Sequence, residues 1–271
     1  MNVLILGANG FLGSQLKQNL PFNIFILDKK KSRAETYSSE AIARNIEDNN
    51  INVIINCCGS YSNNYDVDYL ANVQVTQNVL RVVSGRRLNV KVILFGSSAE
   101  YGITSNNPID EDMICNPKSI YGITKFTQYL VSKYYAHNLL LNIVYLRLFN
   151  IHGINAPETL VTGKLLKYIR DGDINLKFGP LSAQRDYLST EEFVECVRVF
   201  CEVKHTDFLY NIGKGKPVVV RDMLLDILKN HDVHDFNLIE REGDVSDDII
   251  YPSIQKFIKL RGKYYEKSKA W

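Results

Sequence analysis

The sequence has little net charge and no long apolar run, and each absence excludes a class of protein. Its 32 Lys and Arg residues nearly balance 30 Asp and Glu residues, for a net charge of +2. A balance this even gives no reason to expect nucleic acid or a membrane surface as a partner. No apolar stretch approaches the ~20 residues of a membrane span, and Met1 leads into an apolar run without a basic leader. We therefore expect neither a membrane segment nor a signal peptide.

Cysteine is also scarce, and its placement argues against a disulfide or metal scaffold. The five cysteines stand at irregular positions, and two of them, Cys57 and Cys58, are adjacent. This arrangement matches neither a disulfide framework nor the paired spacing of zinc ligands. We expect reduced thiols, no metal site and a cytoplasmic location.

Short apolar runs alternate with stretches of helical periodicity through residues 1–150. Strands are expected at 3–6, 24–27, 53–56, 90–95 and 142–148, and helices at 11–20, 39–50, 69–83 and from about 121 to 137. Strands that alternate with helices of this length predict right-handed βαβ units and a doubly wound parallel sheet, which is an α/β fold. We therefore expect residues 1–150 to form one domain.

The alternation loosens after Asn150. Helices are expected at 159–171, 191–202 and 220–229, and a late strand at 208–211. No flexible linker separates the two halves of the chain. We therefore expect residues 151–271 to form a smaller lobe, with segments of about 185–215 returning to the sheet.

A glycine triad stands between the first strand and the first helix, in the segment Gly7-Ala-Asn-Gly10-Phe-Leu-Gly13. Gly7 can make the tight turn, Gly10 lets the backbone approach a pyrophosphate, and Gly13 allows close packing of helix on strand. The helix N-terminus adds unpaired N–H groups and a positive dipole end. The order of strand, triad and helix predicts a dinucleotide cradle, which also contains Asn9, Phe11 and Leu12.

Asp28 ends the second expected strand, about 20 residues after the triad begins. An acidic side chain there can accept hydrogen bonds from the adenosine ribose, and it would repel a 2′-phosphate, so it favours NAD over NADP. Lys29 and Lys30 follow directly and could offset that charge. The cofactor is therefore expected to be NAD(H) or NADP(H), with NAD favoured.

Tyr121 and Lys125 are four residues apart in Tyr-Gly-Ile-Thr-Lys, and on a helix they share one face. A nearby ammonium favours the ionised form of a phenol. Bringing a phenol of pKa ~10 to neutrality requires a shift of about three units, or about 4 kcal/mol. By itself this spacing is also typical of a surface pair, but next to a dinucleotide cradle it predicts a proton donor and acceptor for hydride transfer.

Together these motifs resemble the extended short-chain dehydrogenase/reductase superfamily, and within it the NAD-dependent epimerase/dehydratase type. That type comprises nucleotide-sugar epimerases, 4,6-dehydratases and 4-keto reductases. The resemblance spans nearly the whole chain and rests on the following motifs in family order: the Gly7–Gly13 loop, Asn56-Cys-Cys-Gly59, Asn72, Ser97-Ser98, Tyr121-x-x-x-Lys125, Arg147-Leu-Phe-Asn150-Ile-His-Gly153, Phe178-Gly179, Arg185-Asp186-Tyr187, Asn211-Ile-Gly213 and Arg241-Glu-Gly-Asp244. It implies a Rossmann domain with a C-terminal substrate-binding lobe.

The resemblance also implies roles for individual residues. Tyr121 matches the catalytic acid/base, Lys125 its partner, and Ser98 the catalytic hydroxyl that bonds the sugar oxygen; counting back from Tyr101 favours Ser97 instead. Further cofactor contacts are implied for Thr36, Tyr37, Cys57, Cys58, Gly59, Asn72 and Ser97. The positions that hold the nucleotide diphosphate match Asn150, Arg185, Arg241 and Asp244.

Three reactions share these residues. A 4-keto reductase is expected first, because Ser-Ser-Ala-Glu-Tyr-Gly and the short stretch from Asp28 to Val53 resemble those of such enzymes. A 4-epimerase comes second and a 4,6-dehydratase third. Glu100 is a candidate for the extra acid or base that a dehydratase needs, or else a loop carboxylate that bonds backbone N–H groups. A regulatory NAD(P)-binding module is the alternative outside enzymes, and family habit implies a homodimer.

Overall fold

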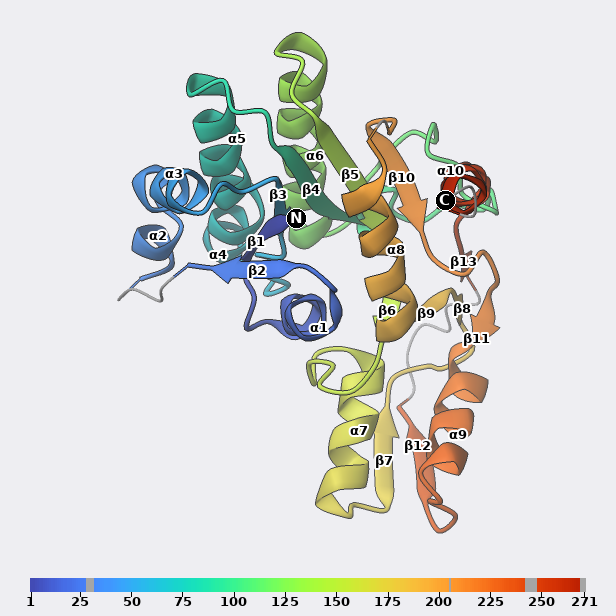
Figure 1. Cartoon of the computed structure of the whole chain (residues 1–271). Coiled ribbons are helices and arrows are strands. Elements are labelled where there is room, and N and C mark those ends of the chain that lie inside the picture. Colours follow the sequence, from blue (N-terminus) through green and yellow to red (C-terminus); the bar gives the residue numbers. More distant parts are fainter. Residues whose placement is uncertain (28–31, 205, 242–247, 269–271) are drawn as a thin grey trace.

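The computed structural model describes residues 1–27, 32–204, 206–241 and 248–268 (Figure 1). Within these ranges, no helix is both long enough and apolar enough to cross a membrane. Asp28, Lys29, Lys30 and Asp244 lie outside the described residues, so the predictions made for them concern positions that the structure does not describe.

A six-stranded parallel sheet forms the centre of the molecule, with strand order β10-β5-β4-β3-β1-β2. The strands are β1 (Asn2–Leu6), β2 (Asn23–Ile26), β3 (Val53–Asn56), β4 (Lys91–Ser97), β5 (Ile143–Leu148) and β10 (Leu209–Ile212). Every residue of β3 and β5 is buried, which explains why these strands are mostly apolar, with Asn56 and Arg147 as the exceptions. The chain reverses its direction of winding between β1 and β3, and ligands bind at such switch points, at the carboxyl ends of the strands.

Helices cover both faces of this sheet (Figure 1). One face packs against α1 (Phe11–Asn19), α8 (Thr190–Glu202) and α10 (Gln255–Ser268). The other packs against α3 (Ser39–Asp48), α5 (Val75–Gly85) and α6 (Ile120–Asn138). Successive residues of β1 alternate between the two clusters, with Val3 and Ile5 in one and Leu4 and Leu6 in the other. Because successive side chains of a strand point to opposite faces, the same sheet contributes to an apolar core on each of its two faces.

Two shorter helices complete the first half of the chain. They are α2 (Arg33–Thr36) and α4 (Tyr65–Tyr69). A π-helical turn, Leu70–Gln74, joins α4 to α5, so this helical stretch begins before the expected residue 69.

The second half forms a small lobe that projects from the sheet (Figure 1). Its elements are β6 (Asn150–His152), α7 (Val161–Asp171), β7 (Asn175–Phe178), β8 (Gln184–Arg185), β9 (Tyr187–Ser189), β11 (Val218–Val219), α9 (Val220–Asn230), β12 (Asn237–Glu240) and β13 (Ile249–Ile250). Within residues 185–215, β10 pairs with β5 in the main sheet, whereas β8 and β9 pair in smaller sheets. Leu165, Leu176 and Leu224 help to build a separate apolar core in the lobe.

Candidate active site

A cavity of about 640 Å³ lies where the glycine loop, the carboxyl ends of β3 and β4, and the start of α6 converge. This is the end of the sheet at which ligands of doubly wound folds bind. Many residues singled out from the sequence line it: Gly10, Phe11, Leu12, Cys57, Cys58, Gly59, Ser97, Ser98, Tyr121, Lys125 and Asn150. Residues far apart in the sequence therefore meet in one site.

The glycine loop has the close backbone contacts that a phosphate cradle requires. Gly7 has φ 73°, and a Cβ there would lie 2.8 Å from the Cys57 carbonyl carbon. A Cβ on Gly13 would lie 2.2 Å from the Gly7 carbonyl oxygen, so α1 packs directly on the loop. Helix α1 begins at Phe11, and its N-cap Gly10 provides no side-chain cap. The first N–H groups of α1 are thus suited to an anionic phosphate, and the residues present fit a dinucleotide.

Tyr37 packs against this loop. Its hydroxyl accepts a hydrogen bond from the Gly7 N–H at 3.2 Å, and it also interacts with the Cys58 thiol. Burial raises the pKa of Tyr37 well above its usual value. Thr36 is buried and donates to the Ser32 carbonyl oxygen at 2.8 Å. Tyr37 therefore supports the cradle from the segment that follows β2.

The capping of α6 sets the position of Tyr121. The Ser119 hydroxyl accepts a hydrogen bond from the Gly122 N–H at 3.0 Å, so the helix starts just before Tyr121. The Tyr121 phenol interacts with the Ser97 hydroxyl, and the ring of Tyr61 packs edge-on against it, with centroids 4.8 Å apart. Burial raises the pKa of Tyr121 to about 12, although the Ser97 hydroxyl acts in the opposite direction. Ser97, which counting from Tyr101 favours, is therefore the hydroxyl next to Tyr121.

Burial, rather than Lys125, dominates the pKa of Tyr121 in this geometry. Lys125 is only 5% exposed, and its ammonium donates to the Phe95 carbonyl oxygen at 2.8 Å and to Gln128 Oε1 at 3.1 Å. Burial lowers the pKa of Lys125 to about 8. The ammonium is thus directed at two uncharged acceptors, and desolvation of the phenol dominates at Tyr121.

Glu100 is buried and does not belong to the described cavity lining. It lies in a 3₁₀ turn, Ser98–Glu100, and is 0% exposed. Its Oε1 accepts from the Ser97 N–H and the Tyr145 hydroxyl, both at 2.9 Å, and its Oε2 lies 2.7 Å from Arg147 Nε. Both oxygens have partners, and the bond from the Ser97 N–H is the one expected of a loop carboxylate. Glu100 therefore fixes the loop that carries Ser97.

Asn72 also has a different contact from the one expected. Its Oδ1 accepts from the Ser60 N–H at 3.0 Å, and its Nδ2 donates to the Ser60 carbonyl oxygen at 3.1 Å and to Thr124 Oγ1 at 3.0 Å. The side chain is 0% exposed, and it is outside the cavity lining. Asn72 therefore positions the segment after Gly59 against α6.

Of the residues expected to hold a diphosphate, Asn150 reaches the cavity. Arg185 pairs with Asp248 at 2.8 Å and also donates to the Asp248 and Gln184 carbonyl oxygens. Arg241 is exposed and bonds Phe178 through its backbone N–H. Neither arginine belongs to the described cavity lining, so the predicted contacts of both with a diphosphate stay a prediction.

Two residues of the site had no clear signal in the sequence. Tyr61 follows Gly59 in a loop without a motif of its own, and it lines the cavity beside Tyr121. Gln128 is one helical turn after Lys125 and is 1% exposed. A polar residue at that spacing was the available hint, since it shares the buried face of α6 with Lys125.

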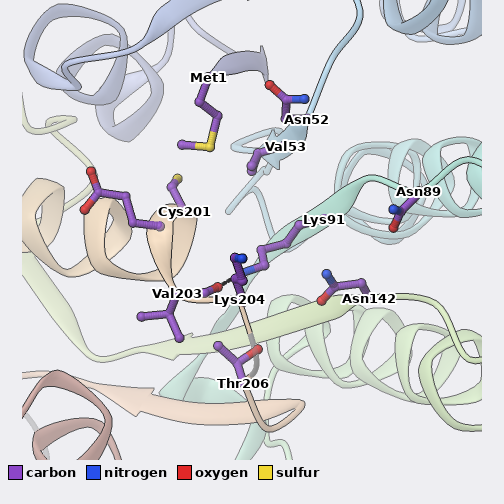
Figure 2. Close-up of a pocket in the computed structure, with 11 residues that line it drawn as sticks. Met1, Asn52, Val53, Asn89, Lys91, Asn142, Cys201, Val203, Lys204 and Thr206 are labelled. Carbon is purple, nitrogen blue, oxygen red and sulfur yellow. Dashed lines mark hydrogen bonds between the residues drawn. The ribbon is translucent and has the colours of Figure 1, made fainter. Parts of the chain in front are cut away.

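A second cavity, of about 690 Å³, lies at the opposite, amino end of the strands and contains none of these motifs. Asn52, Asn89 and Asn142 line it together with Lys91 (Figure 2). The Lys91 ammonium donates to the Phe200 carbonyl oxygen at 2.9 Å and to that of Val203, at the C-terminus of α8. A lysine there satisfies the last carbonyl groups of a helix, so Lys91 has a structural role.

Comparisons with known proteins agree with this architecture. The family model described as "NAD dependent epimerase/dehydratase family" matches residues 3–213. A putative UDP-glucose 4-epimerase of Methanocaldococcus jannaschii is 28% identical over 260 residues, covering 84% of this chain and 81% of the relative. An Escherichia coli dTDP-4-dehydro-6-deoxyglucose reductase is 25% identical over 254 residues, covering 82% and 79%.

Solved structures share the fold at low sequence identity. RMD from Pseudomonas aeruginosa, complexed with NADPH, superposes with a TM-score of 0.83 at 16% identity, covering 96% of this chain and 92% of that one. UDP-glucose 4-epimerase from Thermotoga maritima, with UDP-glucose, gives a TM-score of 0.80 at 19% identity, covering 99% of both chains. The predicted Rossmann-type α/β fold is therefore confirmed.

Proposed function

Because the chain belongs to the NAD-dependent epimerase/dehydratase family, we propose that it transfers a hydride at C4 of a nucleotide-activated sugar. The observation that carries this proposal is the convergence of Ser97, Tyr121 and Lys125 with the glycine loop in one cavity. Relatives of the same fold contain NADPH or UDP-glucose. A nicotinamide dinucleotide, NAD(H) or NADP(H), is accordingly the proposed cofactor, with NAD favoured by the predicted role of Asp28.

A nicotinamide held in this cavity would supply or accept the hydride. The chain's own residues hold the sugar oxygen and move its proton. In reduction, the C4 carbonyl carbon gains the hydride and its oxygen takes the proton of the Tyr121 phenol. The Ser97 hydroxyl donates a hydrogen bond to that oxygen as negative charge develops on it. Lys125, on the same cavity wall, favours the phenolate that remains on Tyr121.

We propose a 4-keto-6-deoxysugar reductase as the specific activity. Reduction begins with a protonated tyrosine, and burial raises the pKa of Tyr121, which favours the protonated phenol. The relative named as a dTDP-4-dehydro-6-deoxyglucose reductase, which matches 82% of this chain, supports the same choice.

A nucleotide-sugar 4-epimerase is the second candidate, supported by the relative named as a putative UDP-glucose 4-epimerase. It would use the same residues but begin by removing the proton of the C4 hydroxyl. A 4,6-dehydratase is disfavoured, because Glu100 is buried and both of its oxygens have partners.

Two measurements separate these reactions. The purified protein is first assayed for retained nucleotide, since an epimerase recycles a bound cofactor and a reductase exchanges it. It is then incubated with 4-keto sugars and nucleotide sugars while the absorbance of the reduced nicotinamide is followed. Net oxidation with a 4-keto sugar supports the reductase, and product formation without net oxidation supports the epimerase.

Replacement of Tyr121 by Phe tests the chemical role directly. We expect kcat to fall by about 10²- to 10⁴-fold, the usual contribution of a general acid or base. Tyr134→Phe is the matched control, because Tyr134 lies on the same helix and is 55% exposed. Unchanged turnover in Tyr121→Phe would refute the mechanism. Cofactor binding without turnover of any sugar would favour a regulatory module instead.

We also propose that the chain forms a homodimer through an exposed apolar face on the contacting helices α4 and α6. Tyr65 on α4 is 52% exposed, and Leu130 and Tyr134 on α6 are 51% and 55% exposed. Leu130 and Tyr134 are four residues apart and so share one face of α6, and an exposed apolar face is typical of an interface. Leu130→Glu is expected to shift the sedimentation coefficient from dimer to monomer. A wild-type monomer at all concentrations would contradict the proposal.

A further inference from the structure

We propose that Gln128 is a positioning residue whose amide fixes the direction of the Lys125 ammonium and leaves one of its three N–H groups for the cavity. The contact itself is a property of the fold, and its consequence for catalysis rests on the function proposed above. Gln128 is 1% exposed and lies outside the cavity lining, so it acts through Lys125 rather than on a ligand.

The orientation of the Gln128 amide follows from its other partner, Thr76. Thr76 Oγ1 donates its hydroxyl proton to the Asn72 carbonyl oxygen at 3.1 Å. It must therefore accept from Gln128 Nε2 at 2.9 Å, as it does from Asn56 Nδ2 at 3.0 Å. With the Nε2 group facing Thr76, Oε1 faces Lys125. This chain of buried donors and acceptors determines which way the amide points.

The ammonium of Lys125 has three donors, and the Phe95 carbonyl and Gln128 Oε1 take two of them. Lys125 lines the cavity, and its Nζ lies close to Gly59, 3.8 Å from where a Cβ on that residue would stand. The third donor is thus available on the side of the proposed cofactor and Tyr121. Loss of either acceptor would free the ammonium to rotate or withdraw.

Both acceptors are uncharged, and this determines the electrostatics of Lys125. The titratable groups that act on it from neighbouring elements are Glu100, Cys57, Cys58 and Asp68. None of them forms an ion pair with Lys125 among the described residues. Gln128 therefore orients the ammonium without the strong rise in pKa that a carboxylate in contact would cause. The residue at position 128 therefore determines both the direction of the Lys125 ammonium and how readily Lys125 is protonated.

The test is the pKa of Lys125, measured by NMR in protein labelled with ¹³C at lysine Cε and assigned with Lys125→Arg. In Gln128→Leu an acceptor of the ammonium is lost, so the pKa of Lys125 should fall. In Gln128→Glu a carboxylate replaces the amide, so the pKa should rise by about 1 to 3 pH units. Opposite shifts from two substitutions at one site are not expected from a general loss of packing.

Two further variants control the experiment. Thr76→Val removes the hydroxyl that orients the amide and should shift the pKa of Lys125 in the same direction as Gln128→Leu, but less. Ser132→Ala removes another buried hydrogen bond on α6, from Ser132 Oγ to the Gln128 carbonyl oxygen at 2.7 Å, and should leave the pKa of Lys125 unchanged. An equal pKa of Lys125 in wild type, Gln128→Leu and Gln128→Glu would overturn the proposal.

Activity gives the second readout. We expect Gln128→Leu to lower kcat by about ten- to a hundredfold, as for loss of a hydrogen bond to a charged group. The pH above which kcat declines should fall in Gln128→Leu and rise in Gln128→Glu. The NMR shifts support the positioning role even if no sugar is turned over, whereas a failure of the wild type to bind NAD(H) or NADP(H) refutes only the proposed function.

Discussion

Replacing Glu100 by Gln removes the charge of a carboxylate that is buried together with Arg147. The Glu100 and Arg147 side chains are 0% and 1% exposed, and the two charged groups meet at 2.7 Å. The guanidinium is flanked by the rings of Tyr101 and Tyr129, each 4.5 Å from it. Arginine stays charged in proteins, so the substitution leaves a buried cation without its counter-charge.

The expected cost follows from this burial. Removing one partner of a buried ion pair typically destabilises a protein by about 3–5 kcal/mol. The Arg147 guanidinium also interacts with the Tyr101 hydroxyl and with the Glu111 carbonyl oxygen at 3.5 Å, but both are uncharged and cannot replace the carboxylate. The Ser97 N–H would also lose a charged acceptor. We therefore expect Glu100→Gln to lower the free energy of unfolding by about 3–5 kcal/mol.

Urea unfolding, followed by circular dichroism, measures this change. The matched control is Glu158→Gln, because Glu158 pairs with Arg170 at 3.4 Å on the surface, with exposures of 57% and 66%. A pair of that kind contributes about 0–1 kcal/mol. The double variant Glu100→Leu with Arg147→Met should recover much of the loss, since no buried charge remains. A loss in Glu100→Gln no larger than in Glu158→Gln would refute the reasoning.

Two other predictions concern the reacting groups. Ser97→Ala is expected to lower kcat by more than tenfold. Ser98→Ala should have a smaller effect, because it is the Ser97 hydroxyl that interacts with Tyr121. Equal losses of kcat in the two variants would contradict this assignment. Burial lowers the pKa of Lys125 to about 8, from 10.5, so the folded protein binds fewer protons than the unfolded chain between those values. The free energy of unfolding should therefore rise with pH across that window. Chemical denaturation should show this rise in the wild type and not in Lys125→Met. In addition, kcat should fall as pH rises through about 8.

The central strands of the main sheet could be predicted from the sequence because they are buried on both faces. The predicted strand 53–56 coincides with β3, and 142–148 is within one residue of β5. The lobe was harder to predict because its strands are two to four residues long and pair over great distances, as β8 does with β13. Runs that short have no periodicity of their own.

One part of the candidate site could likewise be predicted from the sequence, and another part could not. Local spacing was sufficient for the glycine loop and for Tyr121 and Lys125, because a turn and a helix place residues a few positions apart in a known geometry. The sequence alone was sufficient to predict a Rossmann-type chain with the glycine loop and the Tyr-x-x-x-Lys pair on which the proposed hydride transfer rests.

Tertiary structure decided which partners these groups meet. The Ser97 hydroxyl interacts with Tyr121, and Glu100, which accepts from the Ser97 N–H, is paired with Arg147 on a neighbouring strand. Arg185 is paired with Asp248, which is 63 residues away in the sequence. Gln128 holds Lys125 because Thr76, on another helix, orients its amide. Such contacts depend on burial and on partners brought together by folding, which no local pattern encodes.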